Sequence, residues 1–171
     1  MSLAAPKSIN PRDWQSRGNP QNLLGHSIFV IDEGPANAPI ILFLHGFPTS
    51  SWDWNLIWES LKKDYRLIAL DMLGFGFSDK PNRQDYSIHQ QADIVEALVK
   101  KNQLKEFHVL AHDYGDTVAQ ELLSRQIEEN GAGYWLSCCF LNGGLFPETH
   151  RALLTQKLLL SPVGKYLNYL T

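Results

Sequence analysis

The sequence contains very little cysteine, which limits how the chain can be cross-linked. Its two cysteines, Cys138 and Cys139, are adjacent within 171 residues, and neighbouring residues cannot form an ordinary structural disulfide. Nothing in the sequence therefore indicates an oxidising compartment. The N-terminal residues lack the apolar core of a signal peptide, and no apolar run reaches the roughly 20 residues needed to span a bilayer. We therefore expect a soluble, cytoplasmic protein with no strong membrane signal.

An excess of positive charge is also absent. The formal net charge is −3, and no basic stripe is present, which argues against nucleic-acid binding. The six histidines show none of the spacings typical of metal sites. The Gly-x-Gly at residues 74–76 lacks the third glycine of a dinucleotide-binding fingerprint. We predict no metal and no cofactor.

Apolar runs of strand length alternate with amphipathic helical patterns. This alternation predicts an α/β fold with a mostly parallel sheet and helices on both faces. The helix after the second strand carries Leu56, Ile57 and Leu61 at helical spacing. Its three tryptophans are also at helical spacing, and we predict that they lie in the core or on a surface that faces the cap: Trp52, Trp54 and Trp58. Ser87 and Gln90 form a capping box, and the strand that carries both cysteines is predicted to be buried. The sequence predicts strands at 26–34, 40–46, 65–72, 107–112 and 135–144, and helices at 50–63, 87–103 and 114–130.

The segment Ala111-His112-Asp113-Tyr114-Gly115 follows a predicted strand and opens a predicted helix. Small residues two positions on either side of a polar residue are typical of a nucleophile elbow, whose sharp turn leaves no room for bulky side chains. A helix N-terminus favours an ionised carboxylate, and a carboxylate can attack an electrophilic carbon to form an ester. We predict that Asp113 is the nucleophile; the alternative is an acidic helix N-cap.

A second motif, His45-Gly46-Phe47-Pro48, follows another predicted strand. In a hydrolase with a nucleophile elbow, the backbone N–H after the His-Gly pair and the one after the nucleophile point at one position and stabilise an oxyanion there. Those donors would be Phe47 and Tyr114. We predict supporting roles for His45, Gly46, Pro48, His112 and Gly115.

Together these motifs resemble the α/β-hydrolase superfamily. The segments HGFPTSSWDW, DMLGFGFSDKP, HDYGDTVAQEL and NGGLFPETHR are similar to the epoxide hydrolase and haloalkane dehalogenase branch, and most similar to mesoderm-specific-transcript-type hydrolases. The resemblance covers roughly residues 26–160. It implies that Asp113 opens an epoxide within a small, apolar, electrophilic substrate. Similar dehalogenases carry Asn and Trp at these two positions as N–H donors for a leaving halide, whereas this chain has Phe47 and Tyr114. The resemblance therefore favours epoxide chemistry, and haloalkane dehalogenation is the alternative.

The resemblance also implies groups that this sequence does not show. The family's acid and base follow later strands, whereas the only histidine after Asp113 is His150, in a loop that does not supply the family's base. Glu148 and His150 are the alternative candidates for acid and base. We expect residues 1–22 to be a leader with one short strand near Trp14, 23–149 to be the N-terminal part of the core, and 150–171 to start a helical cap.

The missing parts limit the expected activity. Without the C-terminal strands and a base, the chain alone is expected to form an ester without turning over. The alternative is a non-catalytic hydrolase-fold module that needs a partner chain. The strand at 135–142 would also keep an unpaired apolar edge, through which copies of the chain could self-associate.

Overall fold

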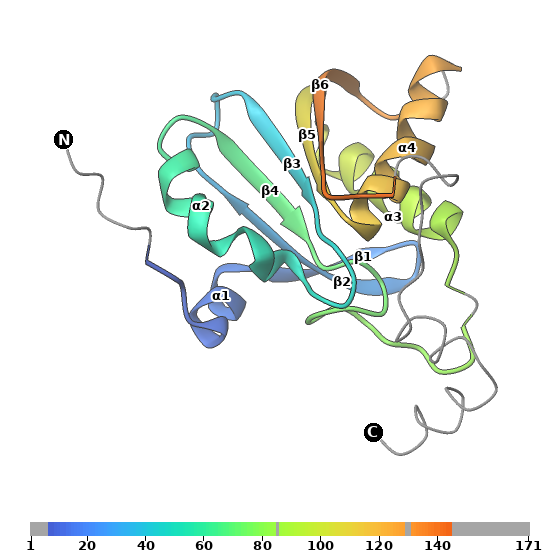
Figure 1. Cartoon of the computed structure of the whole chain (residues 1–171), viewed down its shortest axis with the longest axis horizontal. Coiled ribbons are helices and arrows are strands. Elements are labelled where there is room, and N and C mark those ends of the chain that lie inside the picture. The colour runs from blue at the N-terminus through green and yellow to red at the C-terminus, as the bar shows by residue number, and fades with distance from the viewer. Residues whose placement is uncertain (1–6, 85, 129–130, 145–171) are drawn as a thin grey trace.

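The structure is a computed structural model that describes residues 7–84, 86–128 and 131–144 (Figure 1). From residue 40 onward its strands and helices alternate, as the sequence predicts. The helices are α1 (Pro11–Arg17), the short 3₁₀ helix η1 (Ser51–Trp54), α2 (Asn55–Leu61), α3 (Ile88–Lys101) and α4 (Tyr114–Ile127), and the strands are β1 (Asn19–Leu23), β2 (His26–Glu33), β3 (Ile40–Leu44), β4 (Arg66–Leu70), β5 (Glu106–His112) and β6 (Tyr134–Leu141).

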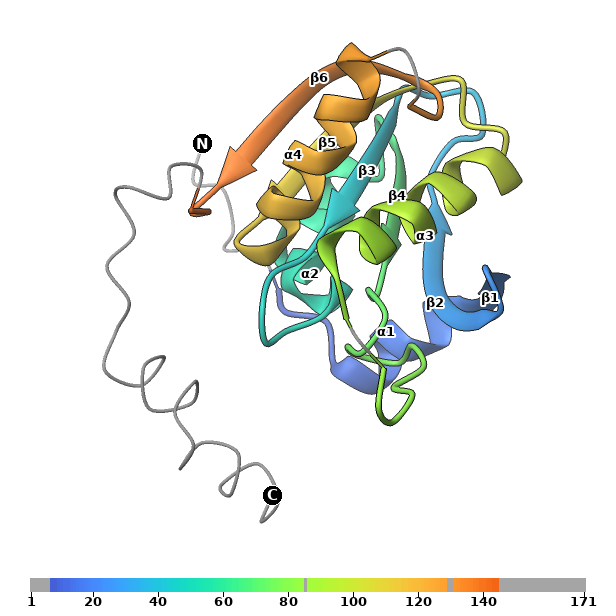
Figure 2. The same ribbon diagram turned by 90° about the vertical axis from the view of Figure 1, so that its right-hand side faces the viewer.

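The strands form one six-stranded sheet in the order β1-β2-β4-β3-β5-β6. The pairs β3–β4, β3–β5 and β5–β6 are parallel, whereas β1–β2 and β2–β4 are antiparallel. Helices α3 and α4 cover one face of the sheet, and α1 and α2 cover the other (Figures 1 and 2). The predicted mostly parallel sheet with helices on both faces is therefore confirmed.

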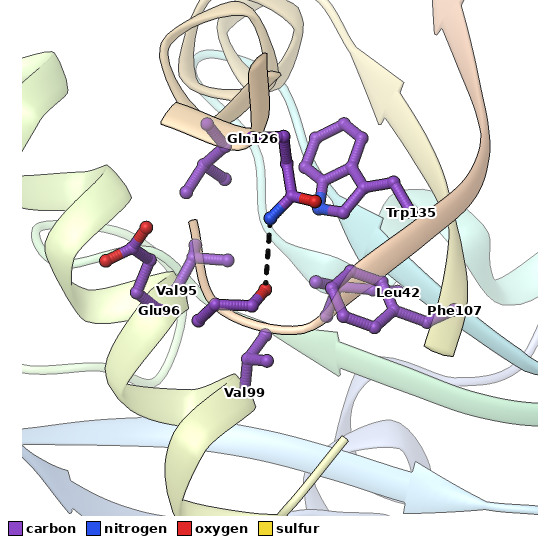
Figure 3. Close-up of a pocket in the computed structure, with 9 residues that line it drawn as sticks. Leu42, Val95, Glu96, Val99, Phe107, Gln126 and Trp135 are labelled. Atoms are coloured by element: carbon purple, nitrogen blue, oxygen red, sulfur yellow. Dashed lines mark hydrogen bonds between the residues drawn. The ribbon is translucent and has the colours of Figure 1, made fainter. Parts of the chain in front are cut away.

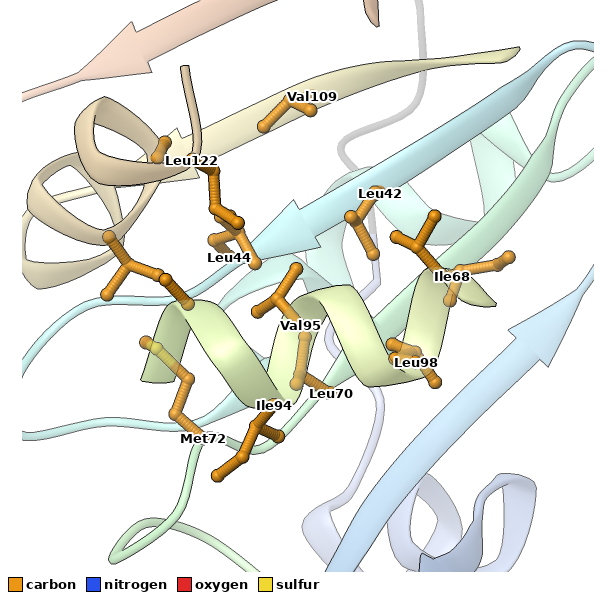
Figure 4. Packing of buried hydrophobic residues seen from close by; sticks show 14 of the residues in the cluster. Leu42, Leu44, Ile68, Leu70, Met72, Ile94, Val95, Leu98, Val109 and Leu122 are labelled. Carbon is orange, nitrogen blue, oxygen red and sulfur yellow. The ribbon is translucent and has the colours of Figure 1, made fainter. Parts of the chain in front are cut away.

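The larger core cluster lies between the sheet and helices α3 and α4. Leu42 and Leu70 on the strands pack against Val95 and Leu98 of α3 (Figure 4). Helix α3 begins as predicted, because the Ser87 side chain accepts a hydrogen bond from the backbone N–H of Gln90. Full burial of one such aliphatic side chain contributes about 1.5–3 kcal/mol, so this packing fixes the sheet on which the predicted site is built.

The second core cluster is aromatic and lies under α1 and α2. The rings of Trp14 and Trp58 lie 5.0 Å apart, and Phe43 of β3 lies 5.3 Å from Trp58. The short strand predicted for the leader is present as β1, but it lies further along the chain than predicted, because Trp14 itself lies in α1. The side chain of Asn10 caps α1, and Pro11 takes its first position, where a missing N–H costs nothing.

The buried face of α2 is formed by tryptophans. Leu56 and Ile57 are exposed, whereas Trp54 and Trp58 are buried and Leu61 is partly buried against the same cluster. A tryptophan removes more apolar surface from water than a leucine does, and the two tryptophans four residues apart therefore set the buried face. The predicted helix is confirmed, and Trp54 and Trp58 lie in the core, as predicted.

Strand β6 lies at one edge of the sheet formed by the described residues. It was predicted to be buried, but Tyr134 and Leu136 are exposed, Cys139 is exposed and Cys138 is only partly buried. The physical reason is that, within these residues, β6 pairs with β5 alone. Self-association through this edge stays a prediction.

A small interior pocket lies between α3, α4 and the start of β6 (Figure 3). Its volume is about 10 Å³, room for at most about one water molecule. Gln126 closes one side by donating its side-chain N–H to the carbonyl oxygen of Ala132, at 3.5 Å. This pocket is a packing defect and not a ligand site.

Among the described residues, no helix is long and apolar enough to cross a membrane.

Candidate active site

Asp113 occupies the turn between β5 and α4. Its backbone angles are φ 52° and ψ −112°, a sparsely populated conformation for a residue with a side chain, at a cost of about 1–3 kcal/mol. The following helix packs closely against β3, because a Cβ atom at Gly115 would lie 2.4 Å from the carbonyl oxygen of Leu44. The strained turn and the close packing are what the sequence pattern predicts for this segment.

Two backbone N–H groups converge on one oxygen of Asp113. Phe47 N donates to Asp113 Oδ1 at 2.8 Å, and Tyr114 N donates to the same oxygen at 2.7 Å. An ordinary N-cap side chain accepts from the second or third helical residue, whereas this one accepts from the first and from a loop 66 residues away. Within the described residues, Oδ2 has no hydrogen-bond partner. The N-cap alternative therefore accounts for only part of this geometry.

Phe47 belongs to the loop that follows β3, and Pro48 follows it through a cis peptide bond. His45 is fully buried under this loop. Gly46 leaves the space that the turn needs, because a Cβ there would lie 2.8 Å from Asp113 Cβ. The HGFP motif is thus adjacent to the Asp113 turn, as the predicted supporting role of these residues requires.

A buried carboxylate beneath the site, Asp71, was missed in the sequence analysis. One of its oxygens accepts from Ser51 N and the other from Phe77 N, both at 2.7 Å. Asp71 therefore ties two loops at the carboxyl end of the sheet to the end of β4. The available signal was its position, because a charged residue directly after a buried strand needs strong partners.

His112 precedes Asp113, and its side chain lies near η1. Its Nδ1 is 3.8 Å from Asp53 Oδ2, and its ring is 6.4 Å from that of Trp54. No histidine in the described part of the chain hydrogen-bonds to the carboxylate of Asp113. Glu148 and His150 lie outside the described residues.

A groove of about 410 Å³ borders both N–H donors. The rings of Phe47 and Tyr114 lie 6.1 and 5.8 Å from that of Phe75, and burial raises the pKa of the Tyr114 phenol. Aromatic walls of this kind suit a small apolar molecule. The lining residues are Phe47, Leu73, Gly74, Phe75, Tyr86 and Tyr114.

Asp116, one turn into α4, is also fully buried. Burial raises the pKa of its carboxyl group. One of its oxygens accepts from Leu141 N at 3.4 Å, so Asp116 contacts the end of β6.

Within the described ranges, no three His, Cys, Asp or Glu side chains gather where they could hold a metal ion.

The fold and the site geometry can now be compared with known proteins. Residues 39–153 match the family model described as the alpha/beta hydrolase fold. The chain belongs to the α/β hydrolase fold family. Among family members, it is 51% identical over 172 residues to the mesoderm-specific transcript homolog protein of Bos taurus, covering 92% of this chain and 51% of the relative. It is 35% identical over 157 residues to the putative hydrolase LipZ of Mycobacterium tuberculosis, covering 92% of this chain and 54% of LipZ.

Solved structures of the family show the same architecture. Haloalkane dehalogenase DbeA from Bradyrhizobium elkani superimposes with a TM-score of 0.66 at 29% identity, covering 74% of this chain and 41% of that one. A putative ancestral haloalkane dehalogenase gives a TM-score of 0.71 at 25% identity, covering 87% and 53%. The chain thus spans about half the length of the relatives that it matches.

Proposed function

We propose that this chain carries the nucleophile and the oxyanion donors of a hydrolase that works through an aspartyl ester, similar to epoxide hydrolases. The supporting observation is the pair of N–H groups from Phe47 and Tyr114 on a single oxygen of Asp113. They orient the carboxylate so that Oδ2, which has no hydrogen-bond partner among the described residues, is left to react.

In the proposed first step, Asp113 Oδ2 attacks a ring carbon of an epoxide bound in the aromatic groove. The carbon–oxygen bond of the ring breaks, the ring oxygen takes a proton from a water molecule, which leaves as hydroxide, and an ester forms. Oδ1 becomes the ester's carbonyl oxygen and stays against the two N–H groups. When water adds to the ester carbon, the negative charge develops on Oδ1, where both donors already point.

The second step needs a general base to activate water. No histidine of the described residues hydrogen-bonds to the carboxylate of Asp113, and the ring of His112 lies near Asp53 and Trp54. We therefore expect the base to come from elsewhere, in a longer form of the protein or in a partner chain. The isolated chain is therefore expected to form one ester per molecule and then stop.

Haloalkane dehalogenation is the second candidate, and its support is the likeness to solved haloalkane dehalogenases. A leaving halide needs N–H donors. The side chain of Phe47, at the groove, supplies none, and Tyr114 offers only its phenol. This difference favours an epoxide, whose leaving oxygen stays attached to the substrate carbon skeleton.

Mass spectrometry after incubation with styrene oxide tests the proposal. We expect the peptide that contains Asp113 to gain the mass of one epoxide, and hydroxylamine to remove the adduct because it cleaves esters. Asp113→Asn should abolish the adduct. Asp64→Asn is the matched control, because Asp64 is exposed in the turn between α2 and β4, and its substitution should leave the adduct unchanged.

Two outcomes would change the conclusion. An adduct from 1-bromohexane with bromide release, and none from styrene oxide, would establish the dehalogenase alternative. No adduct from either compound in the folded chain would leave a non-catalytic module as the better description.

A further inference from the structure

The orientation of the Phe47 N–H depends on the peptide group to which it belongs. That peptide joins Gly46 to Phe47 and is trans, so its C=O and N–H point in opposite directions. The N–H end meets Asp113 Oδ1 at 2.8 Å. Whatever holds the Gly46 carbonyl oxygen at the other end therefore aims the N–H.

Three groups surround the Gly46 carbonyl oxygen. They are His45 Nδ1 at 2.8 Å, Thr49 N at 3.2 Å and Thr49 Oγ1 at 3.0 Å. The Thr49 hydroxyl also contacts the carboxylate of Asp53. A hydroxyl has one hydrogen, and a carboxylate is the stronger acceptor, so this hydrogen goes to Asp53. His45 Nδ1 is then the shortest remaining contact to the carbonyl.

The other ring nitrogen of His45 determines where its proton lies. Met72 N contacts His45 Nε2 at 2.9 Å. A backbone N–H can only donate, so Nε2 must carry the lone pair. Burial lowers the pKa of His45, which favours the neutral ring. A neutral ring with its lone pair on Nε2 carries its proton on Nδ1, and Nδ1–H donates to Gly46.

We propose that His45 is a positioning residue that aims the N–H of Phe47 at Asp113 by donating Nδ1–H to the carbonyl of the same peptide. The chain of hydrogen bonds runs from Met72 through His45 and the Gly46–Phe47 peptide to the carboxylate. Each bond in such a chain polarises the next, so the same donation also makes the Phe47 N–H a stronger donor. The consequence for catalysis rests on the proposed function, but the geometry does not.

Two substitutions separate the two ends of the imidazole. In His45→Asn, the amide nitrogen takes the place of Nδ1, which keeps the donor to Gly46 and loses the acceptor for Met72. In His45→Gln, the amide oxygen reaches the place of Nε2, which keeps that acceptor and loses the donor. Each variant removes one buried hydrogen bond, so a merely structural role would affect both to a similar degree.

The first measurement is ¹⁵N NMR on the full chain, which needs no activity. Long-range ¹⁵N correlations should show His45 protonated on Nδ1, and the Phe47 amide proton should move upfield in His45→Gln but remain near its wild-type position in His45→Asn. A proton on Nε2 in the wild-type chain would overturn the inference, even if neither variant folds. An unchanged Phe47 amide in folded His45→Gln would overturn it as well.

The second measurement is the rate at which hydroxylamine cleaves the styrene oxide ester of Asp113 in the folded chain, because addition to the ester carbon is the step that places negative charge on Oδ1. Removing one oxyanion donor outright costs about 10²–10³-fold in rate. Misaiming it should cost less, so we expect a roughly ten- to hundredfold loss in His45→Gln and a much smaller loss in His45→Asn. Equal losses in both variants would assign His45 a structural role only. Without any wild-type adduct, the proposed function fails, and the NMR result alone decides the role of His45.

Discussion

Replacing Gly115 with alanine tests the contact between the start of α4 and the end of β3. A Cβ at this position would lie 2.4 Å from the carbonyl oxygen of Leu44 and 2.7 Å from that of His45, whereas ordinary contact begins at 3.4 Å. Both oxygens belong to the backbone, so no side-chain rotation relieves the contact. Helix α4 must therefore move away from the sheet.

Two effects of opposite sign determine the size of the change. Alanine is favoured over glycine inside a helix by about 1 kcal/mol. Overpacking in a buried contact costs typically about 1–3 kcal/mol and occasionally more, and two backbone contacts this short favour the upper part of that range. We expect Gly115→Ala to lower the free energy of unfolding by about 1–2 kcal/mol.

Urea unfolding followed by tryptophan fluorescence measures the change. Thr117→Ala is the matched control, because Thr117 is exposed on the same helix and gains helix propensity without a clash. It should be as stable as the wild type or up to about 0.7 kcal/mol more stable. If Gly115→Ala proves as stable as Thr117→Ala, then α4 does not approach β3 as the structure describes, and the position of Tyr114 N must be reconsidered.

Two further predictions concern the contact between α4 and β6. Burial raises the pKa of the Asp116 carboxyl group, so the native state holds this proton more tightly than the unfolded state does. Asp116 therefore lowers the free energy of unfolding as the pH rises above the group's ordinary pKa of 3.8. Asp116→Asn should therefore raise the urea midpoint at pH 7 but not near pH 3, and an equal difference at both pH values would contradict this. Burial raises the pKa of the Cys138 thiol to about 12, while Cys139 is exposed. A maleimide should therefore label Cys139 first, and peptide mapping that finds Cys138 labelled first would refute the orientation of β6.

The central strands could be predicted from local pattern alone. Strands β3 and β4 lie within the apolar runs at 40–46 and 65–72, and β5 contains the run at 107–112 and begins one residue earlier. These runs were readable because a parallel strand covered on both faces must be apolar on both. The start of α3 was equally readable, because the Ser87 cap is a local interaction. The reciprocal half of the predicted capping box is not formed, since Gln90 Oε1 has no hydrogen-bond partner among the described residues. Helix α1 carried a comparable signal in Asn10 and Pro11, which the sequence analysis overlooked.

The errors concern which side of an element is covered. Helix α2 has apolar residues on both sides, and their spacing alone did not show that the predicted core tryptophans, rather than Leu56 and Ile57, would pack against Phe43. Strand β6 is apolar like a central strand, yet Cys139 is exposed because of its place at the sheet edge. Which side of a helix or strand is buried depends on neighbours distant in sequence, and the periodicity of apolar residues does not reveal those neighbours.

By itself, the sequence determined that Asp113 would sit in a tight strand-to-helix turn, because the small residues around it and the helix after it are local requirements. It also pointed to the N–H groups of Phe47 and Tyr114. Only the tertiary structure decided that both N–H groups donate to one oxygen of Asp113, and that His45 holds the peptide group that joins Gly46 to Phe47. Those contacts join segments 66 residues apart, and the packing of β3 beside β5, not any local preference, brings them together.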